Sequence, residues 1–216
     1  MSTLLLQNIC YSYEKGRPGR PILNNLNAEF ASGRFYAILG PSGSGKTTLL
    51  NLLGGLDAPQ QGRILFAKED IAQRGLAYHR RNRVALIFQN YNLLDYLTPL
   101  ENVALTARED AAAALHRLGL TAAEARRSVR QLSGGQQQRV AIARALACGA
   151  PLILADEPTG SLDADTAAEI GEVLRENAHQ LHKCVLAVTH SAALAAQADV
   201  VLSLEGGRLK IKNVIL

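Results

Sequence analysis

A glycine-rich stretch leaves few folds open to this chain; it reads Gly40-Pro41-Ser42-Gly43-Ser44-Gly45-Lys46-Thr47. The stretch fits the pattern G-x-x-x-x-G-K-[ST] in full. An apolar run, Phe35–Leu39, precedes it, and an amphipathic segment, Lys46–Leu53, follows it. This order predicts a buried strand, a loop and a helix, an arrangement that can wrap backbone N–H groups around a phosphate.

The expected chemistry of this loop follows from its backbone. Glycines allow successive N–H groups to converge on one oxyanion, and the start of a helix adds the positive end of its dipole. In such a loop Lys46 reaches the β- and γ-phosphates of a nucleotide, and the Thr47 hydroxyl is a ligand for Mg²⁺. The alternative is a glycine-rich turn beside a surface lysine, and the flanking strand and helix argue against it.

Short apolar runs alternate with helical patterns along the chain, which is typical of an α/β fold with a largely parallel sheet. The predicted strands are Phe35–Leu39, Val84–Phe88, Leu152–Asp156, Val185–Thr189 and Val200–Leu204. The predicted helices in this alternation are Lys46–Leu53, Gly135–Ala147 and Thr166–His182. The runs that begin at 152 and 185 are apolar on both faces, so we expect helices to cover them on both sides.

Two regions depart from the alternation. Residues 4–30 are β-rich, and residues 90–131 are helical and rich in alanine, without a strand-like run. Within the second region, helices are predicted at Glu101–Leu105 and Ala111–Leu118. We therefore expect a single domain over 1–216. Its α/β core with the N-terminal β-rich part takes up 1–89 and 132–216, and an inserted helical subdomain takes up 90–131.

Two carboxylates end the apolar run that starts at residue 152. Asp156 and Glu157 are adjacent, so their side chains point to opposite sides of a strand. Asp156 is therefore predicted to serve the metal ion, and Glu157 to act as the general base on the water that attacks the γ-phosphate. Taken alone, such a pair more often caps a helix or lies in a solvated turn, and the upstream phosphate loop reverses that preference.

A second glycine-containing stretch reads Leu132-Ser133-Gly134-Gly135-Gln136 and opens another helical pattern. Ser133 is a good N-cap, and the glycines expose N–H groups at the helix start. This predicts a second phosphate-binding surface. One γ-phosphate does not need two such surfaces from one chain, so we expect a second subunit to supply it.

LSGGQ, with a phosphate loop before it and an acidic strand end after it, resembles the ATP-binding-cassette (ABC) ATPases over essentially the whole chain. The resemblance implies a P-loop NTPase fold of the ABC type, ATP hydrolysis with Mg²⁺, and a head-to-tail dimer, either a homodimer or a paired cassette. Gln89 matches the glutamine that senses Mg²⁺, and His190 matches the switch histidine near the γ-phosphate. Asp163, in Ser161-Leu162-Asp163, matches the D-loop. Tyr13 lies where the family stacks an aromatic ring on adenine, and Tyr11 remains an alternative.

The motifs and the resemblance together predict three groups of site residues. The catalytic residues are Lys46, Gln89, Glu157 and His190. The metal ligands are Thr47, Gln89 and Asp156. The nucleotide contacts are Tyr13, Gly40, Pro41, Ser42, Gly43, Ser44, Gly45, Lys46, Thr47, Thr48, Ser133, Gly134, Gly135, Gln136 and Asp163.

Within the family, the stretches Leu53-Gly54-Gly55-Leu56-Asp57 and 155–163 most resemble one branch. It contains lipoprotein-releasing, macrolide-efflux and cell-division ATPases and antimicrobial-peptide exporters. The resemblance implies a separate integral membrane permease, a peripheral location at the cytoplasmic face of the membrane, and export or transenvelope mechanotransmission. The alternatives are the ATPase of a solute importer, which uses the same chemistry, and a soluble ABC ATPase that acts on ribosomes or DNA.

Charge and hydropathy narrow these alternatives. The net charge of +4 is too small to predict a nucleic-acid partner. No apolar run approaches the ~18–20 residues that span a bilayer. The first eight residues lack the basic and apolar regions of a signal peptide. Two basic clusters, 79–83 and 126–130, are either solvated helix faces or contacts for a permease loop or anionic lipid.

Overall fold

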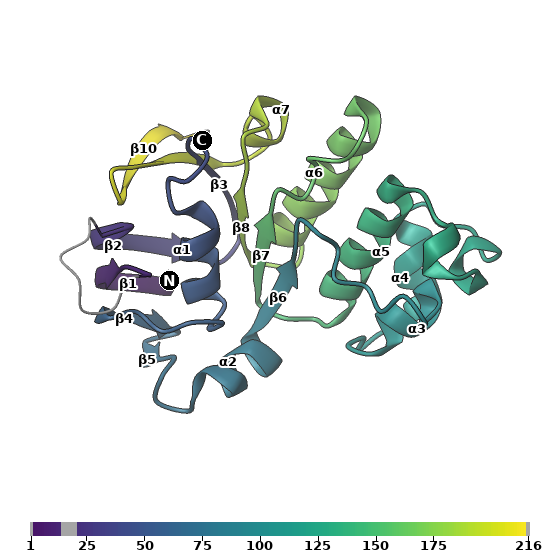
Figure 1. Cartoon of the computed structure of the whole chain (residues 1–216), viewed down its shortest axis with the longest axis horizontal. Coiled ribbons are helices and arrows are strands. Elements are labelled where there is room, and N and C mark those ends of the chain that lie inside the picture. Colours follow the sequence, from purple (N-terminus) through teal and green to yellow (C-terminus); the bar gives the residue numbers. More distant parts are fainter. Residues whose placement is uncertain (1, 14–20, 215–216) are drawn as a thin grey trace.

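The computed structural model describes residues 2–13 and 21–214 of the chain (Figure 1). In chain order its elements are β1 (Ser2–Tyr11), β2 (Leu23–Ala31), β3 (Arg34–Leu39), α1 (Lys46–Leu53), β4 (Gln61–Phe66), β5 (Glu69–Asp70), α2 (Leu76–Arg83), β6 (Val84–Ile87), α3 (Pro99–Ala104), α4 (Ala111–Arg117), the 3-10 turns Glu124–Arg126 and Val129–Gln131, α5 (Gly134–Ala147), β7 (Leu152–Asp156), α6 (Ala164–His179), β8 (Cys184–Val188), α7 (Ala192–Ala195), β9 (Val200–Glu205) and β10 (Arg208–Val214). Among the described helices, none combines the length and apolar character needed to cross a membrane.

A six-stranded sheet in the order β10-β9-β3-β8-β7-β6 forms the centre of the molecule. The strands from β9 to β6 run parallel, and the edge strand β10 is antiparallel to β9. The largely parallel core sheet predicted from the sequence is confirmed. The register pairs Asp156 of β7 with Val188 of β8, so these two strands end side by side at the edge where α/β folds bind ligands.

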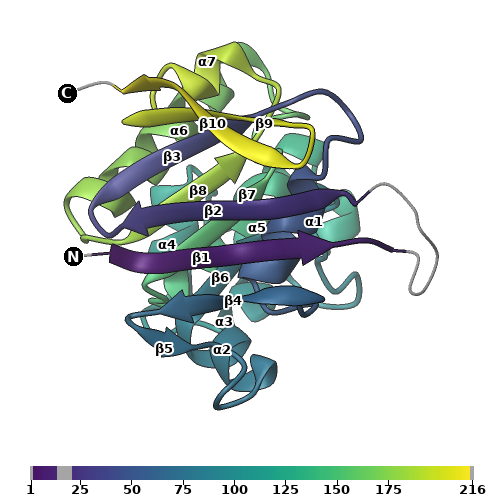
Figure 2. The same ribbon diagram turned by 90° about the vertical axis from the view of Figure 1, so that its left-hand side faces the viewer.

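One face of this sheet is covered by α1 and by a second, antiparallel sheet in the order β2-β1-β4-β5, which faces the viewer in Figure 2. Helix α1 lies between the two sheets (Figure 1). Leu49 and Leu53 of α1 are buried in one apolar cluster with Leu154 of β7 and with Leu6 and Phe30 of the antiparallel sheet. The β-rich N-terminal part therefore packs against α1, the helix that follows the glycine-rich loop.

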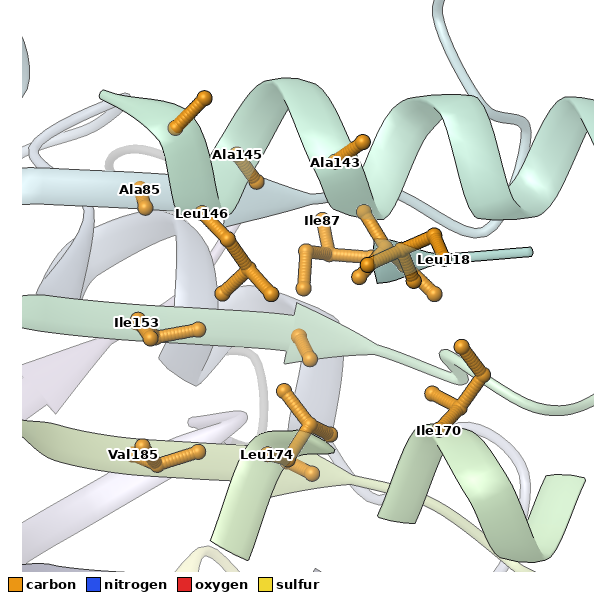
Figure 3. Close-up of a cluster of buried hydrophobic side chains, with 14 of the residues drawn as sticks. Ala85, Ile87, Leu118, Ala143, Ala145, Leu146, Ile153, Ile170, Leu174 and Val185 are labelled. Atoms are coloured by element: carbon orange, nitrogen blue, oxygen red, sulfur yellow. The ribbon is translucent and has the colours of Figure 1, made fainter. Parts of the chain in front are cut away.

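The opposite face of the central sheet is covered by α5 and α6. In Figure 3, Ile153 of β7 and Val185 of β8 lie between Leu146 of α5 and Leu174 of α6. Side chains alternate along β7, so Ile153 faces these helices while Leu154 faces α1. Each fully buried residue of this size contributes about 1.5–3 kcal/mol, which explains why β7 and β8 are apolar on both faces.

The segment between β6 and α5 is helical, as expected. Its helices α3 and α4 pack against α5, on the side of the molecule away from β1 and β2 (Figure 1). Val103 of α3, Leu115 of α4 and Val140 of α5 are buried in the same cluster that covers the central sheet. The helical segment thus shares its core with α5. The division of the chain at 90 and 131 stays a prediction.

Helix α6 differs from its predicted bounds, Thr166–His182. It starts earlier because the Asp163 carboxylate caps it, accepting the N–H of Thr166 at 2.9 Å. It ends at His179, and the chain then turns through His182, which has a positive φ of 51°. Leu181, which falls inside the predicted bounds, lies beyond the observed end of the helix and is 61% exposed.

The basic cluster at 79–83 is not uniformly a solvated face, because His79 is fully buried. Its Nε2 lies 2.9 Å from the carbonyl oxygen of Leu53, which can only accept, so this nitrogen donates. The other ring nitrogen, Nδ1, is buried and has no hydrogen-bond partner within residues 2–13 and 21–214. Burial lowers the pKa of His79 below its usual value of 6.5.

We expect His79 to make the folded protein sensitive to acid. Because its pKa is lower in the folded chain, the unfolded chain binds the proton more tightly once the pH falls below about 6.5. The free energy of unfolding should then fall by up to about 1.4 kcal/mol per pH unit from this group. Urea denaturation at pH 7.5, 6.5 and 5.5 should show a smaller loss for His79→Gln, whereas the exposed His116→Gln should match the parent. Equal slopes for parent and His79→Gln would contradict the assignment.

Candidate active site

The glycine-rich loop between β3 and α1 has the backbone that its sequence predicts. Gly43 and Gly45 have φ angles of +76° and +98°, in the left-handed region that favours glycine. A Cβ at Gly40 would lie 2.7 Å from Ser44 Oγ and 2.8 Å from the carbonyl oxygen of Leu204, so only glycine fits there. Gly45 is the N-cap of α1, and no side chain caps the helix start. The N–H groups at this helix start thus remain available to an anion.

A further feature fits this loop to a phosphate group. The Lys46 ammonium folds over the loop and donates to the carbonyl oxygens of Gly40 and Pro41, at 2.6 and 3.2 Å. The described hydrogen-bond partners of the Lys46 ammonium are neutral, so its positive charge can attract a multiply charged anion at the start of the helix.

The predicted site residues converge on a cavity of about 410 Å³ at the C-terminal edge of the central sheet. Its lining includes Ile22, which was not predicted, and the predicted residues Tyr13, Ser42, Gly43, Gly45, Lys46, Thr47, Thr48, Gln89, Asp156, Glu157 and His190. These residues come from six separate parts of the chain, and the parallel sheet brings them together. Gly40, Pro41 and Ser44 belong to the same loop without lining the cavity.

Asp156 and Thr47 form the candidate metal site. The Thr47 hydroxyl donates to Asp156 Oδ2 at 2.9 Å, so the two predicted ligands are already adjacent. Burial raises the pKa of the Asp156 carboxyl, and the neighbouring Glu157 acts in the same direction. A bound divalent cation would stabilise the ionised form of Asp156 at this position.

Glu157 follows the end of β7 and has a positive φ of 46°, which is unusual for this residue type. Its side chain is 10% exposed, whereas that of His190 is 74% exposed. Glu157 Oε1 lies 2.8 Å from His190 Nδ1, and Oε2 accepts from the Thr189 hydroxyl at 2.9 Å and from the His190 N–H at 3.3 Å. The predicted base and the predicted switch histidine are therefore in direct contact.

The two tyrosines considered for adenine have different surroundings. Tyr13 is 65% exposed at the cavity, and its hydroxyl lies 2.8 Å from Thr48 Oγ1. Tyr11 is buried and donates its hydroxyl to Asp57, a hydrogen bond that raises its pKa to about 12. The ring of Tyr11 meets that of Tyr13 edge-on, with 5.4 Å between centroids. Tyr11 is therefore a buried residue that packs against the Tyr13 ring, and Tyr13 is the tyrosine exposed at the cavity.

The LSGGQ residues lie outside this cavity. The Ser133 hydroxyl accepts the Gln136 N–H at 3.2 Å, while the Gln136 amide oxygen accepts the Ser133 N–H at 2.9 Å, which together form a capping box at the start of α5. The Gln136 amide also donates to Glu124 at 2.7 Å. Asp163, the D-loop residue, likewise caps its own helix. The structure does not bring these five predicted residues, Ser133 to Gln136 and Asp163, to the phosphate loop of the same chain.

Sequence reasoning missed two features around the site. Thr189 was predicted as the last strand residue without a role, yet its hydroxyl contacts the Glu157 carboxylate. Tyr91, two residues after Gln89, donates its hydroxyl to Ser161 at 3.0 Å, and the Arg144 guanidinium donates to the Tyr91 carbonyl oxygen at 2.9 Å. These contacts join residues far apart in the sequence, so no local pattern could have predicted them.

Comparisons with known proteins agree with this geometry. The family model described as ABC transporter matches residues 23–160. The chain is 42% identical to the lipoprotein-releasing system ATP-binding protein LolD of Pseudomonas syringae pv. tomato, over 96% of this chain and 97% of LolD. It is 43% identical to the macrolide export ATP-binding/permease protein MacB of Chromobacterium violaceum, over 95% of this chain and 34% of MacB.

A solved structure gives the same result at the level of the fold. The dimeric post-hydrolysis state of the ATP-binding cassette MJ0796, bound to ADP and Pi, has a TM-score of 0.89 and 34% sequence identity, with 99% of both chains covered. The relatives also match the branch that the sequence resembles. Sequence, fold and relatives agree, and the chain belongs to the ABC transporter family as one of its ATP-binding, ATP-hydrolysing cassettes.

Proposed function

We propose that two copies of this chain, or this chain and a paired cassette, bind two Mg-ATP head to tail and power a separate membrane permease. The observation that carries the proposal is the separation of two phosphate-binding surfaces within one chain. The described lining of the cavity at Lys46 includes none of residues 133–136, which form the start of α5. Two chains related by a twofold axis would complete both sites. The related MJ0796 cassette is described as a dimer, which supports this arrangement.

Within each composite site we assign roles from the geometry. Lys46 and the loop N–H groups hold the β- and γ-phosphates, and Tyr13 stacks on adenine. Thr47, Asp156 and Gln89 hold Mg²⁺, directly or through water. Bound there, Mg²⁺ would supply positive charge that stabilises the negative charge developing on the phosphate during transfer.

The hydrolytic step needs a base beside the γ-phosphate. Glu157 takes a proton from the attacking water, and its low exposure keeps competing water away from the carboxylate. His190, exposed beside it, turns toward the γ-phosphate once the partner cassette closes over the site. The Ser133 hydroxyl proton and the N–H groups of the glycines after it are supplied by the partner to the same phosphate.

A second groove, lined in part by Phe88 next to Gln89, offers a docking surface for the permease. This groove of about 770 Å³ runs between α2 and β6 on one wall and the α3–α4 segment and α5 on the other. Its lining has four arginines, Arg80, Arg81, Arg108 and Arg144, and none of its described lining residues is acidic. Leu94 and Leu105 line it and are 36% and 57% exposed. This combination fits a short permease segment that carries apolar side chains and an acidic group.

We place the cassette at the cytoplasmic face of the membrane, held there by this permease, and we favour export or transenvelope work over import. The support is the similarity to LolD, named for lipoprotein release, and to MacB, named for macrolide export. In MacB the cassette-like part is about a third of a longer protein that also contains the permease. We expect no nucleic-acid partner.

A pull-down tests the permease part of the proposal. Tagged Glu157→Gln protein with Mg-ATP should capture a polytopic membrane protein from detergent-solubilised membranes of the source organism, identified by mass spectrometry. A matched variant with Arg81→Glu and Leu105→Glu in the groove should lose that protein while it retains ATP binding. Recovery of soluble proteins, ribosomes or DNA in place of a membrane protein would overturn the transport assignment.

A further inference from the structure

The Glu157 carboxylate is held by Thr189, a residue outside the motifs described above. Thr189 follows β8 and is fully buried. Its backbone N–H donates to the carbonyl oxygen of Ile38 at 3.1 Å, which fixes it between two strands of the sheet. Its hydroxyl lies 2.9 Å from Glu157 Oε2. A rigid part of the fold thus contacts the candidate base directly.

The surroundings of this hydroxyl define the direction of its proton. The Ser191 N–H points at Thr189 Oγ1 from 3.0 Å and can only donate, so the oxygen accepts there. An ionised carboxylate can only accept, so the Thr189 proton is directed at Glu157. The hydroxyl therefore has one orientation that satisfies both neighbours, and that orientation restrains Oε2.

The two oxygens of Glu157 are held in different ways. Oε2 has two partners next to the backbone, the Thr189 hydroxyl and the His190 N–H. Oε1 has the His190 ring, whose side chain is 74% exposed at the cavity. The ring can rotate away without disturbing β8, whereas Thr189 cannot. When His190 leaves, Oε1 becomes available and Oε2 stays fixed.

We propose that Thr189 is a positioning residue for hydrolysis: it holds Oε2 of Glu157 so that Oε1 is the oxygen that receives the proton of the attacking water. The proton passes from water to Oε1 as the water oxygen bonds to the γ-phosphorus and the bond to the β-phosphate oxygen breaks. Thr189 keeps its own proton throughout. This inference rests on the proposed role of Glu157 as the base.

Valine has the shape of threonine without the hydroxyl, and serine keeps the hydroxyl without the methyl group. In steady-state phosphate release with the full chain and Mg-ATP, Thr189→Val should lower kcat by about 10- to 100-fold, the size expected when a catalytic group loses its alignment. KM and equilibrium ATP binding should stay within about twofold of the parent, because Thr189 does not line the cavity. Thr189→Ser should restore kcat to within about threefold of the parent.

Two controls separate positioning from a general loss of structure. Thr159 is also buried, and its hydroxyl has no hydrogen-bond partner among the described residues, so Thr159→Val should keep the parental kcat. Thermal unfolding monitored by circular dichroism shows whether each variant is folded. If Thr189→Val does not fold, the comparison of Thr189→Ser with Thr189→Ala decides, and serine should exceed alanine by at least about fivefold in kcat.

Several results would overturn the proposal. These are a parental kcat in folded Thr189→Val, an equal loss in the serine and valine variants, or a change confined to KM. The Glu157→Gln variant, measured in parallel, separates this inference from the proposed function. If Glu157→Gln keeps its turnover, the base itself is misassigned. If Glu157→Gln is inactive while Thr189→Val is normal, the base stands and the positioning role fails.

Discussion

Replacing Glu157 by glutamine should abolish turnover and leave ATP binding intact. Glutamine has the same shape, and its amide oxygen can still accept from the Thr189 hydroxyl. It cannot take a proton from water at neutral pH, so kcat should fall by about 100- to 10,000-fold, the usual contribution of a general base. The altered contact with the exposed His190 ring should cost less than about 1 kcal/mol of stability.

This expectation can be checked by phosphate release and by equilibrium binding of a fluorescent ATP analogue. Glu176, exposed on α6, provides the matched control, because Glu176→Gln makes the same chemical change away from the site. The control should hydrolyse ATP at the parental rate. Turnover in Glu157→Gln within tenfold of the parent would show that another group takes the proton.

Replacing Lys46 by alanine should weaken ATP binding itself. The Lys46 ammonium is the cation of the phosphate loop, and in the structure it is satisfied by two loop carbonyls. Losing a charge-assisted hydrogen bond to phosphate costs about 2–3 kcal/mol, or roughly 30- to 160-fold in affinity. Hydrolysis should be lost as well, because the same ammonium neutralises the γ-phosphate.

Lys210 provides the matched control for this second prediction. Its ammonium lies on the edge strand β10, 3.9 Å from Glu205, in an exposed pair that contributes little. Lys210→Ala should keep both the affinity and the rate. Isothermal titration calorimetry with the non-hydrolysed analogue AMP-PNP and Mg²⁺ measures the difference. Parental affinity in Lys46→Ala would rule out the phosphate loop as the nucleotide site.

Much of the site could be predicted because its motifs are local. The glycines and Lys46 lie in one short segment, 40–46, between a strand and a helix, so a local sequence pattern identifies them. Asp156 and Glu157 likewise follow directly from the end of an apolar strand. The apolar residues on both faces of β7 and β8 also predicted that helices cover these strands, because this pattern lies within each strand.

The role of Thr189 could not be predicted in this way. Its contact with Glu157 exists because β7 and β8 are neighbours whose ends align, with Asp156 opposite Val188. Strand order and register depend on the packing of the whole sheet. The different surroundings of Tyr13 and Tyr11 could not be predicted from a local pattern either. The hydroxyl of Tyr11 is bound by Asp57, which lies 46 residues away in the sequence. The end of α6 also differed, because a turn after His179 ended an apolar pattern that continued to Leu181.

In the proposed function a second cassette completes the site, and the mass of the Glu157→Gln protein in solution tests this arrangement most directly. Size-exclusion chromatography with light scattering should give the monomer mass with ADP and twice that mass with saturating Mg-ATP. Adding Gly135→Asp should keep the protein monomeric. A carboxylate there suits the helix start, and its Cβ would meet Leu162 at a tolerable 3.4 Å, but it would repel the partner's γ-phosphate. A Glu157→Gln protein that stays monomeric with ATP, or a dimer that forms regardless of Gly135→Asp, would contradict the shared site.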